Sequence, residues 1–366
     1  MKRKTKRQSP VWRRNQEQAC RAAEMVMEGY CAAQIAQEIF KSKNAKAINH
    51  VKPLLQLAEQ SGFLCLTGRE DHKLAADLRD WSGNPDLTCH VVKNDHLAYS
   101  GDPAVDEARR ADAVARKAAE IVAGRIAALL LKYKNGKRRI VIANAGGVAA
   151  SRIVHFLGAH RLLPDETDPR QLLFISLNSA SMPTDYGRSA NVLAVRMAEI
   201  YGGEHIAVCP VCPARQRQIY DHAVHHIDLL VCGAGSDRGI LFTWLRQHAG
   251  ITLPPEAVGD ICLIPISKSG HEVPLDADTR EKADRLLNLK PTYSDLHALA
   301  GRNGIIFVPM GFRSPDPQAD AVSSPEHSKL AVTRAILKHS LTRTCILGAT
   351  LARDLLATPA QADSSA

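Results

Sequence analysis

The sequence has few aromatic residues, no apolar run long enough to cross a bilayer, and no common catalytic motif. Phe, Trp and Tyr make up 5% of its 366 residues, which leaves little for stacking on the bases of single-stranded RNA. Residues 1–16 lack the apolar segment of a secretory signal. Walker, kinase, GxSxG and HExxH patterns are absent. We therefore expect a cytoplasmic protein with no membrane segment, and we predict no cofactor and no catalytic residues.

Cysteine is present, but not in the pattern of a disulfide framework or a zinc site. The nine cysteines are scattered along a long chain, which favours free thiols in a reducing compartment. Only Cys209 and Cys212 show CxxC spacing, and His222, His225 and His226 follow them. A structural zinc site normally takes four ligands from paired motifs. The sequence therefore predicts no metal site.

Positive charge is concentrated at the amino terminus. Residues 1–66 hold twelve Lys and Arg against five Glu, a formal charge of +7 out of +9 for the whole chain. A basic head on a nearly neutral body is typical of a domain that binds a polyanion. The alternative for its first residues, Lys2 to Arg14, is a solvated and disordered tail.

Apolar spacing predicts short helices over residues 18–28 and 32–39, and a third after the polar link 41–44. A helix, a tight turn and a helix carrying Lys, Asn and His is the arrangement of a major-groove reader. The alternative is a small helical cap or dimerisation module. Pro53 is tolerated best in the first turn of a helix, so we expect the third helix to begin near Lys52. The candidate DNA contacts are Lys41, Lys43, Asn44, Lys46, Asn49, His50 and Lys52.

The central stretch Arg138–Gly158 has the pattern of a strand, a glycine turn and a helix. β-Branched residues 140–142 precede the turn at 144–147, and apolar residues at helical spacing follow it. Glycines let a ligand approach the backbone, and the first amides of the helix favour an anion. A plain strand-to-helix turn in a parallel sheet remains the alternative.

Strands and helices alternate through most of the chain. Strands are expected at 63–66, 89–92, 172–177, 206–208, 229–232, 261–264, 305–308 and 344–347, and helices at 72–81, 105–133, 190–200, 216–225, 240–247, 293–300 and 330–339. Such alternation predicts an α/β domain of three layers with a parallel sheet, whose ligands bind at the carboxyl ends of the strands. Residues 358–366 are small and polar, and we expect them to be disordered.

The order of these elements resembles the SorC family of bacterial transcriptional regulators, in the SorC/DeoR grouping. The resemblance is carried by short segments along nearly the whole chain: AEQSGFL at 58–64, HKLAADLR at 72–79, the first glycine loop at 141–153, NVLAVRMAE at 191–199, LVCGAG at 230–235, AVGDI at 257–261, and the closing segments at 329–332 and 353–356. It implies a winged helix-turn-helix domain over residues 1–66. It also implies a Rossmann-like effector and oligomerisation domain over 67–366, similar to sugar-phosphate isomerases, deaminases and CoA transferases.

The same resemblance implies which residues bind an effector. They lie on the first loop (Gly146, Gly147, Ser151), after the second strand (Asn178, Ser179), and further along the chain (Gly233, Gly235, Asp260, Lys329). Lys329 would supply a point charge for a phosphate, and Asp260 would accept sugar hydroxyls. Ala149 stands where the family usually has a hydroxyl residue, so a phosphate donor is missing unless Ser151 replaces it.

The sequence thus favours a transcriptional regulator that binds operator DNA as a dimer or tetramer under the control of a sugar or sugar-phosphate effector. The main alternative is an enzyme, a sugar-phosphate isomerase or deaminase with a basic appendage. For that reaction Asp260 and Asp237 with His271 are the acid–base candidates. RNA binding by the basic head is a third possibility.

Overall fold

The computed structural model describes residues 10–27, 30, 32–60, 69–94, 97, 102–136, 138–177, 188–206, 214–286, 290–310 and 329–357. Its chain forms two compact units, one of residues 1–69 and 93–113 and the other of residues 70–92 and 114–366. The expected strand at 63–66, the expected disorder at 358–366, and Cys209 and Cys212 lie outside the described residues. None of the described helices is long and apolar enough to span a bilayer.

Three helices that pack on one another dominate the first unit: α1 (Pro10–Met27), α2 (Ala32–Phe40) and α3 (Ala45–Gln60). Their small apolar side chains meet in a core that includes Ala22, Ile35, Val51 and Leu55, each no more than 1% exposed. Residues 41–44 join α2 to α3, and Lys41 turns the chain with a φ of 54°. This confirms the expectation of helices separated by a short polar link.

The expected start of the third helix near Lys52 is wrong. Helix α3 begins at Ala45 and continues through Pro53 to Gln60. The side-chain oxygen Oδ1 of Asn44 accepts a hydrogen bond from Ala47 N at 2.8 Å, so the helix has a side-chain cap at its first turn. Pro53 lies on the exposed side of α3, where the ring meets solvent, and neighbouring packing through Val51, Leu54 and Leu55 keeps the helix continuous.

A parallel sheet of seven strands forms the centre of the second unit, with the order β1-β10-β9-β5-β2-β3-β4. All of its strand pairs are parallel. The strands are β1 (Thr88–Val92), β2 (Ile140–Asn144), β3 (Leu172–Ser176), β4 (Glu204–Ile206), β5 (Ile227–Cys232), β9 (Ile305–Phe307) and β10 (Thr344–Gly348). Strands β2, β3 and β10 are buried at every residue, as expected where helices cover both faces of a sheet.

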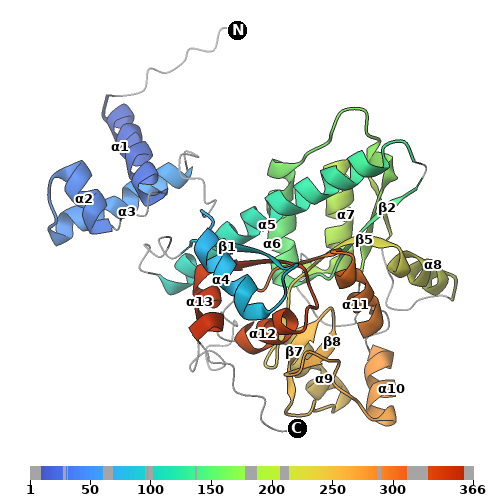
Figure 1. Cartoon of the computed structure of the whole chain (residues 1–366). Coiled ribbons are helices and arrows are strands. Elements are labelled where there is room, and N and C mark those ends of the chain that lie inside the picture. Colours follow the sequence, from blue (N-terminus) through green and yellow to red (C-terminus); the bar gives the residue numbers. More distant parts are fainter. Residues whose placement is uncertain are drawn as a thin grey trace. The chain divides into compact units, whose positions relative to one another are not determined.

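Helices lie on both faces of this sheet (Figure 1). One face packs on α4 (His72–Ser82), α8 (Ala214–His225), α11 (Tyr293–Gly301), α12 (Leu330–Lys338) and α13 (Ala349–Ala357). The other carries α6 (Gly147–Leu157) and α7 (Ala190–Tyr201) beside the long α5 (Pro103–Tyr133). Because strand and helix alternate, the helices run back and each strand ends at the same edge. The prediction of a mixed α/β domain with a mostly parallel sheet is confirmed.

A smaller antiparallel sheet follows β5 and corrects one prediction. Strands β6 (Gly235–Ser236), β7 (Ala257–Ile261) and β8 (Ile264–Ser267) pair in that order, with α9 (Ile240–Ala249) and α10 (Ala277–Leu286) nearby in sequence. The expected parallel strand at 261–264 is wrong. Those residues form the tip of a hairpin, in which Cys262 and Leu263 turn the chain with φ values of 53° and 66°.

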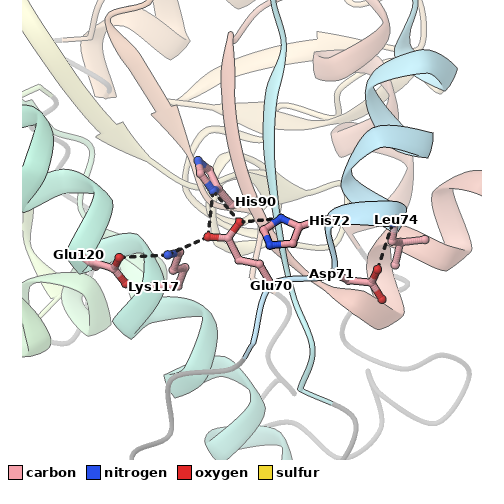
Figure 2. A network of polar contacts seen from close by, with 7 residues as sticks. All are labelled: Glu70, Asp71, His72, Leu74, His90, Lys117 and Glu120. Atoms are coloured by element: carbon pink, nitrogen blue, oxygen red, sulfur yellow. Dashed lines mark hydrogen bonds and ion pairs between the residues drawn. The ribbon is translucent and has the colours of Figure 1, made fainter.

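A polar cluster fixes the start of the second unit (Figure 2). The Glu70 carboxylate lies 2.7 Å from Lys117 Nζ of α5 and 3.2 Å from His90 Nδ1 of β1. Lys117 also lies 3.1 Å from Glu120. Residues distant in sequence are thereby joined where the chain enters α4, whose first turn is capped by the Asp71 side chain bonded to Leu74 N.

Candidate functional site

The first glycine loop is shaped by Asn144, the last residue of β2. Its side chain is 1% exposed. Oδ1 accepts a hydrogen bond from Gly146 N at 3.1 Å, and Nδ2 donates to Ile175 O of β3 and to Ala190 O of α7. One side chain therefore holds the loop against the neighbouring strand and helix. Sequence reasoning did not select Asn144.

The two glycines of this loop are required for different reasons. Gly146 has a φ of 73°, and a Cβ there would lie 2.9 Å from Ala190 N, so close packing excludes a side chain. Gly147 has a φ of 83°, but a Cβ there would meet nothing within 4 Å. The backbone at the start of α6 thus borders open space, and Gly146 gives that helix no side-chain cap. Uncapped amides at a helix start favour an anion.

Ser151 lies further along α6 than the loop itself. Its hydroxyl donates to Val148 O within the helix at 3.0 Å. Ala149, which stands at the position of the missing hydroxyl, is 9% exposed. That bond uses the one proton of the hydroxyl, so Ser151 donates to a phosphate only when the bond to Val148 O is broken.

The second glycine loop lies beside the first. A Cβ on Gly233, the first residue after β5, would be 3.2 Å from Ala149 Cβ, so the second loop contacts the first turn of α6. Gly235 pairs with Asp260 across β6 and β7. The structure therefore brings Gly146, Gly147, Gly233, Gly235 and Asp260 to the carboxyl edge of the main sheet, where ligands of such folds bind.

A buried acid, Asp260, and a half-buried base, Lys329, interact at this edge. Asp260 is 7% exposed, and burial raises its pKa to about 6, although the charge of Lys329 and a hydrogen bond from Leu263 N act in the opposite direction. Burial lowers the pKa of Lys329, while Asp260 and Asp237 raise it. Lys329 Nζ donates to Ala234 O at 2.7 Å. Lys329, just before α12, thus reaches the second glycine loop.

Two further groups of candidate residues remain, the effector contacts after β3 and the acid–base residues of the enzyme alternative. Asn178 and Ser179 lie outside the described residues. The ring of His271 packs beside those of His339 and Tyr293. Within the described part of the chain, no hydrogen bond or ion pair joins His271 to Asp260 or Asp237. Over those same residues, no group of three or more His, Cys, Asp and Glu is arranged to hold a metal ion.

The candidate DNA contacts lie on α3 and the turn before it. Lys46, Asn49, His50 and Lys52 are exposed, whereas Ala47, Val51 and Leu55 are buried. Lys46, Asn49 and His50 share one face by helical spacing. Lys43 is also exposed, Lys41 lies 3.7 Å from Glu38, and the Asn44 side chain caps α3. The exposed polar face of α3 is therefore Lys46, Asn49 and His50.

Comparison with known proteins gives a clear result for the fold. No known protein family matches the sequence, and no curated protein matches it. Among solved structures, the chain is similar to the full-length sorbitol operon regulator SorC from Klebsiella pneumoniae, with 15% identity, a TM-score of 0.50, and coverage of 93% of this chain and 99% of that one.

Two further structures match the larger part of the chain. One is a domain of a possible sugar-binding transcriptional regulator from Arthrobacter aurescens TC1, with 18% identity, a TM-score of 0.51, and coverage of 78% and 97%. The other is a transcriptional regulator from Streptococcus pneumoniae TIGR4, with 14% identity, a TM-score of 0.54, and coverage of 78% and 95%. The larger part of the chain has the fold of these regulators, which confirms the mixed α/β fold with a mostly parallel sheet that the resemblance to the SorC family implies.

Proposed function

We propose that this protein is a DNA-binding transcriptional regulator whose operator affinity is controlled by a carbohydrate-derived, phosphorylated effector. The observation that carries the proposal is the convergence of two glycine loops, Asp260 and Lys329 at the carboxyl edge of the sheet. The fold shared with sugar-binding transcriptional regulators supports it. A regulator of this kind acts in the cytoplasm, together with the DNA.

The effector site combines a cradle for a phosphate with groups for sugar hydroxyls. Gly147 and the first amides of α6 border open space, and Lys329 adds a positive charge. Asp260 accepts hydroxyl donors when ionised and donates when protonated. We retain Gly146, Gly233 and Gly235 as loop residues of the site. Ser151, Asn178 and Ser179 complete the proposed contacts.

The DNA-binding part is residues 1–66, with α2 and α3 as its helix-turn-helix. The exposed polar face of α3 supplies side chains of the kinds that reach base edges and phosphates, Asn49 and Lys46 among them. Residues 67–366 hold the effector and assemble the oligomer. Helix-turn-helix proteins usually bind paired half-sites, so we propose a dimer or tetramer.

Control follows from linkage between the two ligands. An effector that binds one arrangement of the oligomer more tightly than another shifts the operator affinity by that difference, and DNA shifts the effector affinity equally. The buried Asp260 and the half-buried Lys329 are suited to this role, because a bound anion changes the balance of charge that they experience.

The experiment is fluorescence anisotropy with duplexes from upstream of the protein's own gene, over a salt series, with and without sugar phosphates. Specific binding should weaken linearly in log Kd against log salt, and one sugar phosphate should change Kd. Binding to no fragment, with or without metabolites, would contradict the proposal. Turnover of sugar phosphates without DNA binding would favour the isomerase or deaminase alternative.

A thermal-shift screen tests the effector site itself. A sugar phosphate should raise the melting temperature of the wild type, because a ligand bound only by the folded state stabilises it. Lys329→Met should lose this shift, whereas Lys268→Met, which removes a charge from an exposed residue, should keep it. A shift by uncharged sugars alone would show that the loops are not a phosphate cradle.

A further inference from the structure

A basic cleft lies at the amino-terminal edge of the main sheet, opposite the glycine loops. Its volume is about 590 Å³, and it is lined by Arg125, Lys132, Arg138 and Arg302, with Asp228 as its acidic residue. Arg138 comes just before β2 and Asp228 lies at the start of β5. The glycine loops follow the other ends of these same strands. A strand of five or six residues separates the two sites by roughly 15–20 Å.

Over the residues that the structure describes, carboxylates balance only part of the positive charge in this cleft. Asp228 is paired with Arg138, at 2.8 Å. Across the described residues, no carboxylate pairs with Arg125, Lys132 or Arg302. Arg125 donates to Asn303 O and Arg302 to Ile227 O, and these carbonyls are neutral. Three cationic side chains therefore face one concave space without a carboxylate partner among the described residues.

Part of this charge has a structural explanation. Helices α5, α8 and α11 end near the cleft, and cations near the carboxyl end of a helix are stabilised by its dipole. The bonds from Arg125 and Arg302 to backbone carbonyls fit that role. Lys132 donates to no carbonyl in the described part of the chain, and its ammonium lies 5.1 Å from the centre of the Tyr133 ring. A guanidinium has five N–H donors, so both arginines keep donors for a ligand.

We propose that this cleft is a second anion site, which binds a small organic phosphate carrying at least two negative charges. Its volume falls in the range of small-molecule sites. Guanidinium groups bind phosphate oxygens in pairs, and a lysine adds a compact charge. The cleft takes a free metabolite rather than duplex DNA, because its volume matches that of a small molecule. This second site is proposed whether or not the glycine loops bind the effector.

The test uses the full chain and inorganic pyrophosphate as the probe, with sodium chloride at equal ionic strength as the reference. Binding is measured by calorimetry and by thermal shift. Pyrophosphate should raise the melting temperature of the wild type and also of Lys329→Met, because Lys329 belongs to the opposite edge. Lys132→Gln should weaken the pyrophosphate Kd about tenfold, and Lys132→Arg should restore most of the affinity.

Lys134→Gln is the matched control. Lys134 follows the same helix end and pairs with Glu166 at 3.3 Å, outside the cleft, so this variant should bind pyrophosphate as the wild type does. The proposal would be overturned if Lys132→Gln and Lys134→Gln lost equal pyrophosphate affinity. It would also be overturned if pyrophosphate raised the melting temperature no more than sodium chloride does. Loss in Lys329→Met alone would assign pyrophosphate to the glycine loops. If Lys132→Gln weakened binding of a random duplex but not of pyrophosphate, the cleft would be a DNA contact instead.

Discussion

A Cβ atom on Gly235 would lie 1.8 Å from Oδ1 of Asp260. The two residues are partners across β6 and β7, so the carboxylate occupies the space that any side chain at position 235 would need. The tightness extends to the next residue pair, because a Cβ on Gly259 would lie 2.3 Å from Gly235 O. The second glycine loop and the buried acid of the candidate site therefore fix each other's position.

Substitution of Gly235 should destabilise the protein. Gly235→Ala forces Asp260 or a strand to move, and overpacking of this kind costs about 1–3 kcal/mol. The matched control is Gly124→Ala, in the interior of α5, where a Cβ meets nothing within 4 Å. There the same change should stabilise by about 0.5–1 kcal/mol. Urea denaturation of the two variants should give opposite signs. A Gly235→Ala protein as stable as the wild type would contradict the packing described.

Asp260 should give the protein a measurable dependence of stability on pH. Burial raises the pKa of this carboxyl from 3.8 to about 6 in the folded state. Between those values the folded chain binds more protons than the unfolded chain, so the free energy of unfolding falls as the pH rises. The loss should amount to about 2–3 kcal/mol and should be complete above the folded pKa.

Asp260→Asn removes this titration and should flatten the profile of the free energy of unfolding between pH 4 and 7. The absolute stability of the variant says less about the pKa of Asp260, because the substitution also removes a charged partner of Lys329. Asp77→Asn makes the same chemical change at an exposed residue of α4, and its profile should follow that of the wild type. Parallel profiles for all three proteins would show that the pKa of Asp260 is not raised in the folded state.

The face of α3 should separate affinity from specificity. Lys46→Ala removes a cation that we assign to a phosphate, so binding should weaken on all sequences and the slope of log Kd against log salt should fall by about 1. Asn49→Ala should keep the slope but reduce the preference for operator over random DNA, at about 1–3 kcal/mol for a lost base contact. Lys73→Ala, on the exposed surface of α4, should change neither. Identical behaviour of all three variants would exclude this face as the DNA contact.

Sequence reasoning succeeded where burial alone sets the pattern. Strands β2, β3, β5, β9 and β10 are short apolar runs because helices cover both faces of the sheet. It failed at the β7–β8 hairpin, since residues 261–264 are all apolar and the turn residues Cys262 and Leu263 are not the glycine or asparagine that such φ values favour. The predicted start of α3 was wrong because tertiary packing outweighed the free-energy cost of Pro53 inside the helix.

The candidate site was predicted in part for a related reason. Glycines at strand ends are visible in a sequence, and the resemblance to a known family supplied Asp260 and Lys329. Asn144 carries no such signal. Its role depends on carbonyls of Ile175 and Ala190, which are 31 and 46 residues away, and only the fold brings them together.

The cluster around Glu70 provides a last prediction (Figure 2). Burial raises the pKa of Glu70, but hydrogen bonds from Lys117 and His90 outweigh it and leave the pKa below its ordinary value. Burial lowers the pKa of Lys117, and its bonds to Glu70 and Glu120 leave it raised. Both side chains are less than 20% exposed, at 18% and 17%. Removal of one partner should therefore cost more than at a solvent-exposed pair, because the remaining charge stays partly buried.

Lys117→Met should cost about 1–2 kcal/mol at pH 7, because it leaves the Glu70 carboxylate partly buried without its ammonium partner. Lys134→Met breaks a more exposed pair with Glu166 and should cost at most about 0.5 kcal/mol. The pH dependence identifies the cause. A lowered carboxylate pKa gives stability that is present above the ordinary glutamate range and is lost as the pH falls through the folded pKa. In acid, where Glu70 is protonated in both proteins, the difference between wild type and Lys117→Met should shrink. A difference in unfolding free energy that stayed constant from pH 7 into the acid range would mean that Lys117 stabilises the protein by packing rather than by its charge.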